Sequence, residues 1–525
     1  MTMHCYQCEE TNNGEACTTK GLCGKSVSTA KLQDQLIEAA SQLAYATLEI
    51  GDCPKVDDLI RTALFATITN VNFDNQSLRQ LFTCMTNEIE RYTPDAIPSV
   101  IRTDILKSAG VLTMHNPDRR SAKELLIYGV KGIAAYAEHA AQLGYRDSSV
   151  DQFIRQVMAA LTTPLRFSDL MDWIVKAGEV SVATMALLDK AHRECYGSPE
   201  ISEVSLEAGS APGILISGHD LKDLAQLLEQ TKNSGIDIYT HGEMLPAHYY
   251  PYFKQYSHLK GNYGGAWWQQ EQDFSAFNGP ILMTTNCLVP PQDSYEDRLF
   301  TTGPVRHSGL THIETNSAGD KDFSALIDLA HQCRAPEPLE TGHIVGGFGH
   351  DQVMALADQV VEAVQAGAIK RFVVMAGCDG RSDEREYYTQ VAEQLPQDAV
   401  ILTAGCAKFR YNKLDLGTIN GIPRVLDAGQ CNDCYSLAVI ALKLQEAFSV
   451  DSLNDLPLSF DVAWYEQKAV AVLLALLHLG VKGIRLGPNL PAFVTGKVAD
   501  ILLNDFELKG IGSPEQDVEA MMLGR

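Results

Sequence analysis

The chain has 525 residues, of which 45% are hydrophobic, and a formal net charge of −24 at pH 7. A length of this order predicts about three domains, and the apolar fraction is ordinary for a globular protein with a large buried core. The strong negative charge argues against binding to nucleic acid or to an anionic membrane surface.

The N-terminus and the longest apolar run argue against export and membrane insertion. The first residues carry neither the positively charged segment nor the apolar segment of a secretory signal. The longest apolar run, residues 469–481, is interrupted by His478 and Gly480 and is too short to span a bilayer. We therefore expect a cytoplasmic protein, in which clustered cysteines are metal ligands rather than disulfide partners. The total of 13 cysteines is odd, which excludes complete pairing.

The first 208 residues predict an all-α, helical-bundle domain. Apolar residues recur at a three-to-four spacing between residues 31 and 196, as at Leu36, Ala40 and Leu43. Ser121 and Asp169 are the expected N-caps of two of these helices. Besides the helix that contains Leu36, the segments expected to be helical are residues 59–71, 78–92, 122–143 and 169–191.

From residue 209 onward, short apolar runs alternate with helical segments. This alternation predicts Rossmann-like α/β domains with mainly parallel sheets covered on both faces. The glycine-rich residues 346–349 are a candidate break, so we expect domains at residues 1–208, 209–346 and 347–525. The expected strands are residues 213–217, 236–240, 280–285, 372–376, 399–403, 424–427 and 481–486, and the helices between them include residues 221–232, 352–366 and 435–448.

Four cysteines at the N-terminus, Cys5, Cys8, Cys17 and Cys23, follow the pattern C-x2-C-x8-C-x5-C. Thiolates are soft ligands that suit iron–sulfur clusters and zinc. The glycines of this segment give the backbone freedom to wrap around a metal centre. The pattern therefore predicts a metal site, with a structural zinc site as the alternative to an iron–sulfur cluster.

Six further candidate ligands each follow one of the apolar runs. Because ligands bind beyond the carboxyl ends of the strands in open α/β sheets, we expect these side chains to meet. A lone cysteine at a strand end is usually a small buried apolar residue, but its recurrence at four strands favours a second metal centre. Sulfur, nitrogen and oxygen ligands together indicate iron atoms bridged partly by oxygen or left with an open position. The six residues are His219, Glu243, Cys287, Cys378, Cys406 and Cys431.

The remaining cysteines, Cys53, Cys84, Cys195, Cys333 and Cys434, have no comparable context. Cys84 lies in a helical pattern and is expected in the core. Cys434 follows Cys431 in a C-x2-C spacing that permits a redox pair, but we favour a structural thiol.

Taken together, these motifs resemble the hybrid-cluster protein family, also called prismane protein or hydroxylamine reductase. The N-terminal spacing is similar to that of the family's class I members, and the resemblance covers essentially the whole chain. Cys434 lies outside the family's motifs. The segments that carry the resemblance are residues 5–23, 218–220, 240–243, 285–287, 376–380, 403–406, 427–433 and 464–468.

The resemblance implies two iron–sulfur clusters. One is a [4Fe–4S] cluster held by the four N-terminal cysteines. The other is a hybrid cluster of the [4Fe–2O–2S] type between the domains, with Cys378 carrying an extra sulfur as a persulfide. Glu466 enters only through the resemblance. The implied ligands of the hybrid cluster are His219, Glu243, Cys287, Cys378, Cys406, Cys431 and Glu466.

Two metal centres in one chain predict redox catalysis. The resemblance implies an oxidoreductase that reduces hydroxylamine to ammonia and water, with nitric oxide reduction to nitrous oxide as a second reaction. Glu243, Glu466 and Lys468 are the candidate proton donors. The expected partners are a small nitrogenous substrate and a redox protein that donates electrons. The alternatives are a nitric-oxide-responsive sensor or protein S-nitrosylase, a carbon monoxide dehydrogenase-like enzyme, and a zinc-stabilised structural protein.

Overall fold

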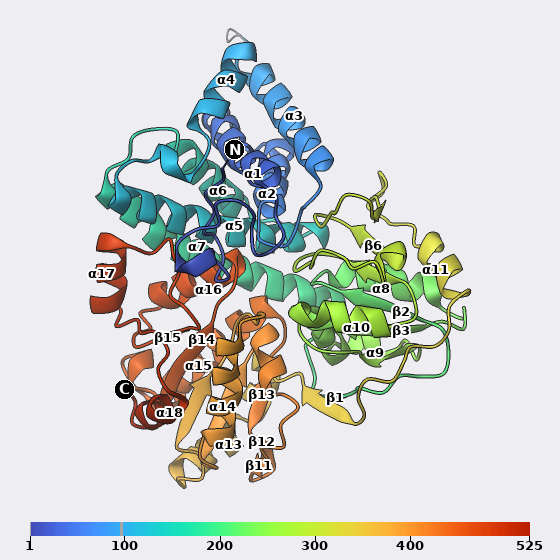
Figure 1. Ribbon diagram of the computed structural model, residues 1–525. Helices are drawn as coiled ribbons and strands as arrows, with labels where there is room; N and C mark the ends of the chain where they lie inside the picture. The colour runs from blue at the N-terminus through green and yellow to red at the C-terminus, as the bar shows by residue number, and fades with distance from the viewer. Residues whose placement is uncertain (1, 95–97) are drawn as a thin grey trace.

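The computed structural model describes residues 2–94 and 98–525, and its first part is helical (Figure 1). Helices α1 to α4 stand at the top of the view, above the long helices α5 (Pro117–Gln142) and α7 (Phe167–Tyr196), which pack on each other. The described residues before Ser202 contain no strand beyond isolated bridges, which confirms the all-α prediction. The other helices are α1 (Val27–Ala46), α2 (Pro54–Ala66), α3 (Asn75–Tyr92), α4 (Pro98–Ser108) and α6 (Ser148–Ala160).

Both predicted N-caps are wrong, because the helices begin earlier. Helix α5 begins after Asn116, so Ser121 lies inside it and donates a hydrogen bond to the carbonyl of Phe493 at 2.7 Å. Helix α7 begins after Arg166, and Asp169 accepts a hydrogen bond from the Arg166 N–H at 3.0 Å. The apolar pattern that guided the prediction starts only after the polar first turn of each helix.

The next part of the chain contains a six-stranded sheet in the order β4-β3-β2-β5-β6-β7, and every neighbouring pair is parallel. The central strands β2 and β3 are buried along their whole length, as expected for a sheet covered on both faces. The sequence did not indicate β4, β6 or β7, which contain polar residues. The elements are β2 (Gly213–Ser217), α8 (Leu221–Thr231), β3 (Asp237–His241), α9 (Pro251–Lys254), β4 (Leu259–Asn262), α10 (Gln270–Ala276), β5 (Ile281–Met283), β6 (Leu299–Thr302), β7 (Thr311–Ile313) and α11 (Ser324–Ala330).

The C-terminal part contains a five-stranded parallel sheet in the order β13-β10-β9-β14-β15. Strand β14 was not predicted, because Asp461 interrupts its apolar run. A short hairpin, β11 (Thr418–Ile419) and β12 (Ile422–Pro423), precedes β13. The elements are α12 (His350–Ala355), α13 (Ala357–Gln365), β9 (Arg371–Val374), α14 (Glu386–Gln394), β10 (Ala399–Thr403), β13 (Val425–Asp427), α15 (Cys434–Phe448), β14 (Leu458–Ala463), α16 (Gln467–His478), β15 (Arg485–Gly487), α17 (Gly496–Asn504) and α18 (Pro514–Met522).

Helix α16, the longest apolar run of the sequence, is buried against α5 and α7. A Cβ atom on Gly132 of α5 would lie 2.6 Å from the carbonyl oxygen of Gln467, and one on Gly178 of α7 would clash with that of Leu474. Glycine at these two positions therefore lets the helical part approach α16 closely. Across the described residues, no helix is long and apolar enough to cross a membrane.

Strand β1 (Ser202–Ser205) pairs antiparallel with β8 (His343–Gly346). These strands flank the six-stranded sheet in the sequence, so the chain enters and leaves that part at one place. The boundaries at residues 208/209 and 346/347 stay a prediction.

Candidate metal centres

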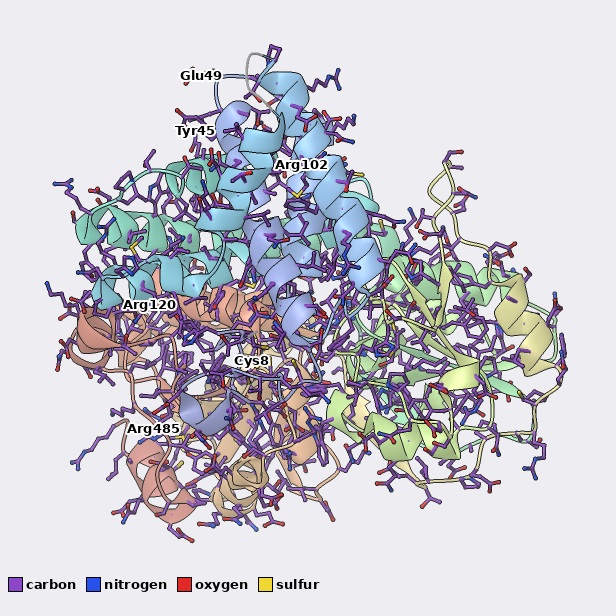
Figure 2. All side chains as sticks on the ribbon, turned by 45° about the horizontal axis from the view of Figure 1, so that its top comes forward. Cys8, Tyr45, Glu49, Arg102, Arg120 and Arg485 are labelled. Carbon is purple, nitrogen blue, oxygen red and sulfur yellow. The ribbon has the colours of Figure 1, made fainter. Side chains whose placement is uncertain are left out.

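The four N-terminal cysteines lie on one looped segment. The N–H of Cys17 donates to the carbonyl of Cys5 at 2.8 Å, and the N–H of Cys5 donates to the carbonyl of Cys17 at 3.2 Å. Cys8, Cys17 and Cys23 are buried, and Cys5 is half-buried. Cys8 lies where the N-terminal helices meet the C-terminal part of the chain (Figure 2). The loop thus gathers four thiols at the junction of two domains.

These thiols affect one another's charge. Burial is the main cause that raises the pKa of Cys8, and the charges of Cys23 and Cys5 raise it further. Burial also raises the pKa of Cys23, against the positive charge of Lys25. Buried thiolates that repel one another require a compensating cation, so this donor set suits a metal centre.

The second predicted set lines a single cavity, which contains about 410 Å³ of space between protein atoms. The cavity lies at the carboxyl ends of strands from both sheets. All seven residues line it: His219 after β2, Glu243 after β3, Cys287 after β5, Cys378 after β9, Cys406 after β10, Cys431 after β13 and Glu466 after β14.

Glycines with positive φ angles turn the backbone directly before four of these residues, His219, Glu243, Cys378 and Cys406. Gly377 and Gly405 have φ angles of +112° and +89° and precede Cys378 and Cys406. A side chain on Gly377 would clash with the carbonyl of Ala463. The Ala-Gly-Cys sequence after β9 and β10 therefore produces a tight turn that presents each thiol to the cavity.

Three of the seven residues form the closest group. One ligand atom each from His219, Glu243 and Cys431 lie within 4.8 Å of one another, and His219 Nε2 lies 3.8 Å from Glu243 Oε2. The Cys431 N–H donates to Glu243 Oε2 at 2.8 Å, whereas Glu243 Oε1 is buried and has no hydrogen-bond partner among the described residues. A metal ligand set without its cation is expected to contain such an unpartnered, buried carboxylate oxygen beside an imidazole and a thiol.

Thr285 sets the orientation of the His219 ring. Its hydroxyl lies 2.8 Å from His219 Nδ1, accepts the His219 backbone N–H at 2.9 Å and donates to the Asn286 carbonyl at 3.3 Å. Because the hydroxyl proton is already used, Nδ1 must carry the proton of the ring, and Nε2 keeps its lone pair. A partner of this kind on the far nitrogen is common behind metal-binding histidines.

Burial is the main cause of the shifted pKa values of the groups that line the cavity. It raises the pKa of Glu243 and Glu466, raises that of Cys431 to about 12, and lowers the pKa of His219 well below its ordinary value. Desolvation is the largest cause for each of these groups. A bound cation would reverse this for the acids and thiols, so the residues present fit an iron–sulfur–oxygen centre.

Lys468 does not line the cavity, but it contacts the same nitrogen of His219 that is offered to a metal. Its Nζ donates to the lone pair of His219 Nε2 at 3.0 Å and lies 3.8 Å from Glu466 Oε1. Burial opposes its charge, but the negative charges of Cys431 and Glu466 outweigh burial and raise the pKa of Lys468. The group of candidate ligands therefore stabilises positive charge.

Several residues that line the cavity were missed by reasoning from the sequence. Glu466 came only from the resemblance, because the polar Asp461 obscured the strand before it. Its position as the N-cap of an apolar helix is the signal that could have found it. There Glu466 Oε2 accepts the Lys468 N–H at 2.7 Å. Trp267 and Tyr465, whose ring centroids lie 4.6 Å apart, had no recognisable signal. Ser217 and Asn286 also line the cavity.

The other thiols lie apart from this set. The prediction that Cys84 lies in the core is wrong: it is exposed, because α3 buries a different face that includes Leu78, Met85 and Ile89. Cys434, in contrast, lines a second, apolar cavity with Cys431.

A helical domain, two parallel α/β domains and two cysteine-rich sites define a class of multidomain metalloprotein. A model of the Prismane/CO dehydrogenase family matches residues 3–519, and the chain belongs to this family. Membership implies iron–sulfur clusters.

Relatives and solved structures agree with this assignment. The chain is 55% identical to a protein named hydroxylamine reductase from Nitratidesulfovibrio vulgaris, over 100% of both chains, and 54% identical to one of the same name from Chlorobaculum tepidum, over 99% of this chain and 100% of that one. It is similar in structure to carbon monoxide dehydrogenase IV from Carboxydothermus hydrogenoformans, with a TM-score of 0.59 and 18% identity over 96% of this chain and 89% of that chain. At this identity the structural likeness shows the fold alone.

Proposed function

We propose that this protein is an oxidoreductase that reduces hydroxylamine to ammonia and water. The observation that carries the proposal is the convergence of one histidine, two glutamates and four cysteines on a single cavity, together with a separate set of four cysteines. The identity of the substrate is inferred from the relatives named hydroxylamine reductase.

In this proposal, Cys5, Cys8, Cys17 and Cys23 hold a [4Fe–4S] cluster. The seven cavity residues His219, Glu243, Cys287, Cys378, Cys406, Cys431 and Glu466 hold a hybrid cluster of the [4Fe–2O–2S] type, with a persulfide on Cys378. When bound, this cluster supplies electrons and a Lewis acid that polarises the N–O bond.

The reaction consumes two protons and two electrons for each hydroxylamine, so proton donors must reach the cavity. Glu243 and Glu466 line the cavity, and either carboxylate would take up and deliver a proton when it is not bound to the cluster. Lys468 lies 3.8 Å from Glu466 and can return a proton to it. The three residues thus act as proton donors and relay.

Electrons arrive from a redox partner protein at the N-terminal loop. Leu22 is 55% exposed although its neighbour Cys23 is buried, so the loop lies just beneath the surface. An exposed apolar side chain beside a redox centre suits the small, transient interface of an electron-transfer complex.

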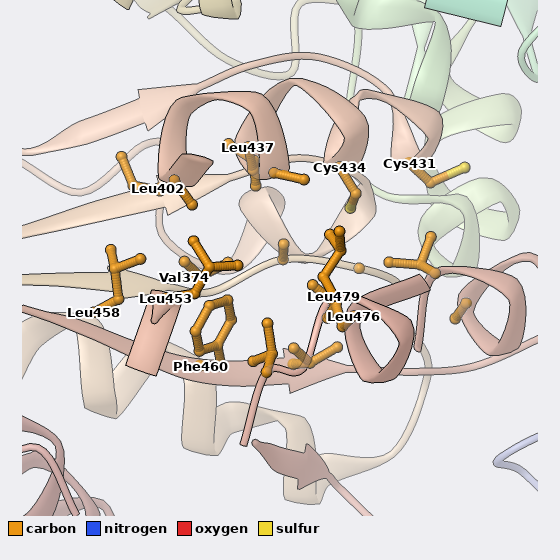
Figure 3. Close-up of a pocket in the computed structure, with 18 of the residues that line it drawn as sticks. Val374, Leu402, Cys431, Cys434, Leu437, Leu453, Leu458, Phe460, Leu476 and Leu479 are labelled. Atoms are coloured by element: carbon orange, nitrogen blue, oxygen red, sulfur yellow. The ribbon is translucent and has the colours of Figure 1, made fainter. Parts of the chain in front are cut away.

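Nitric oxide is the second candidate substrate, and an apolar cavity favours it. This cavity is lined mainly by apolar side chains and borders the metal-site cavity at Cys378 and Cys431. Its wall includes Leu437, Phe460 and Leu476 (Figure 3). A neutral diatomic gas partitions into such a space more readily than hydroxylamine, which carries hydrogen-bonding groups.

Anaerobic turnover with reduced viologen tests both reactions. Protein with quantified iron, sulfide and nickel, and with EPR spectra at each reduction step, should form ammonia from hydroxylamine. Full cluster occupancy without ammonia or nitrous oxide would reject the reductase and favour the sensor or S-nitrosylase, which a transnitrosylation assay on candidate proteins would detect. Nickel in the second site would support the carbon monoxide dehydrogenase-like alternative, and a colourless zinc protein would support a structural role.

A further inference from the structure

A buried chain of three side chains ends at the metal-site cavity. Ser217 Oγ lies 3.0 Å from His241 Nδ1, and His241 Nε2 lies 3.2 Å from Asp273 Oδ2. Ser217 is 3% exposed, His241 0% and Asp273 3%. Ser217 lines the same cavity as the seven candidate ligands.

The carboxylate at the far end sets the direction of these hydrogen bonds. Asp273 Oδ2 accepts the Gly265 N–H at 3.0 Å, so it is the acceptor towards His241 Nε2 as well. With the ring proton on Nε2, His241 Nδ1 is the acceptor towards Ser217 Oγ. Ser217 must then donate its hydroxyl proton to Nδ1.

This arrangement leaves the lone pairs of Ser217 Oγ free. Among the described residues, none donates a hydrogen bond to this oxygen. The nearby Gly242 leaves space beside it, since a Cβ atom there would lie 3.6 Å from Ser217 Oγ. A buried hydroxyl at a cavity wall with unused acceptor capacity suits a ligand that carries N–H or O–H groups.

We propose that Ser217 is a specificity-determining residue, whose hydroxyl accepts a hydrogen bond from hydroxylamine in the cavity and is held as an acceptor by His241 and Asp273. This rests on the proposed function for the identity of the substrate. Hydroxylamine has N–H and O–H donors, whereas nitric oxide has no hydrogen. Ser217 therefore favours hydroxylamine over nitric oxide without taking part in electron transfer.

The same sheet provides a matched control. Thr301 Oγ1 lies 3.0 Å from His312 Nδ1, and His312 Nε2 lies 3.7 Å from Glu314 Oε2. Thr301 is fully buried but does not line the cavity. Thr301→Val thus removes a hydroxyl from the same kind of chain, outside the cavity proposed to bind the substrate.

The test compares wild type, Ser217→Ala and Thr301→Val at matched iron content. The affinity for hydroxylamine is measured from the EPR change on titration of the unreduced, cluster-loaded protein, and KM and kcat are measured for both substrates. In Ser217→Ala, loss of one hydrogen bond should raise Kd and KM for hydroxylamine about fivefold. In Ser217→Ala, the KM for nitric oxide and the kcat for hydroxylamine should stay within about twofold of wild type. Thr301→Val should have the wild-type Kd for hydroxylamine and the wild-type KM and kcat for both substrates. Unchanged hydroxylamine affinity in Ser217→Ala, or an equal loss for nitric oxide, would overturn the proposal.

A second readout needs no cluster and no turnover. Histidine-selective ¹⁵N NMR of the iron-free protein should show His241 with its proton on Nε2 and a bare Nδ1. A proton on Nδ1 would contradict the assigned direction of the chain. If wild type fails to turn over hydroxylamine, the proposed function is wrong, whereas the EPR titration and the NMR spectrum still decide the role of Ser217.

Discussion

The backbone N–H of Glu9 donates a hydrogen bond to the carbonyl of Tyr465 at 2.9 Å. Glu9 follows Cys8, and Tyr465 precedes Glu466, so this hydrogen bond joins the chain segments of the two candidate centres. Arg385 strengthens this junction: it is fully buried and donates to Glu9 Oε2 at 2.8 Å and to the Cys378 carbonyl at 3.3 Å. The two centres are thus held in a fixed relationship, as electron transfer between them requires.

Glu9→Ala tests this junction. The substitution leaves the Arg385 guanidinium buried without its carboxylate, which costs about 3–5 kcal/mol for a pair of this kind. We expect a clear fall in the thermal unfolding midpoint and loss of iron from both centres. Glu384→Ala is the control, because Glu384 is exposed nearby and should change stability by less than about 0.5 kcal/mol. Equal midpoints for the two variants would contradict the anchoring role of Glu9.

Cys17→Ser tests the N-terminal centre. Loss of one of four thiolates should remove the EPR signal of the [4Fe–4S] cluster, while the second centre still assembles from residues of other domains. Cys84→Ala should leave both centres and turnover unchanged, because Cys84 is exposed on α3. Zinc in the wild-type N-terminal site, or loss of a cluster in Cys84→Ala, would refute the assignment.

Glu243→Ala and Cys406→Ala test the second centre. Each removes a donor from the cavity, so turnover should fall below detection while the N-terminal cluster keeps its EPR signal. Cys195→Ala removes a half-buried thiol that does not line the cavity and should retain wild-type activity. Normal turnover in either cavity variant would show that the ligand set is wrong.

Asp461 predicts a pH dependence of stability. Burial raises its pKa to about 7, against the opposing charge of Arg485. The folded state then holds its proton more tightly than the unfolded state, so stability falls as the pH rises from about 4 towards 7 and is level above that. The thermal midpoint of Asp461→Asn relative to wild type should therefore rise between pH 5.5 and 7 and stay constant at higher pH. A constant difference from pH 5.5 to pH 8 would mean that Asp461 is ionised throughout.

The sequence alone determined the fold class and most of the cavity residues. Continuous apolar runs predict parallel strands, and the carboxyl ends of parallel strands share one edge of a sheet. That rule placed His219, Cys287 and Cys406 at strand ends without knowledge of the strand order, since only local pattern was needed. It missed Glu466, because Asp461 breaks the apolar run of β14 and its burial is decided by neighbouring strands.

Only the tertiary structure decided how the two strand edges meet. The strand ends of both sheets line one cavity, and contacts between residues far apart in the chain join them, such as the hydrogen bond that Gln430 Nε2 donates to the Glu243 carbonyl at 2.8 Å. Helical periodicity indicates which residues share a face but not which face is buried, so the environment of Cys84 could not be foreseen. Likewise, Ser217, His241 and Asp273 lie 24 and 32 positions apart, and nothing local to any of them indicates a hydrogen bond. Contacts of this kind depend on the packing of whole elements, which only the folded chain specifies.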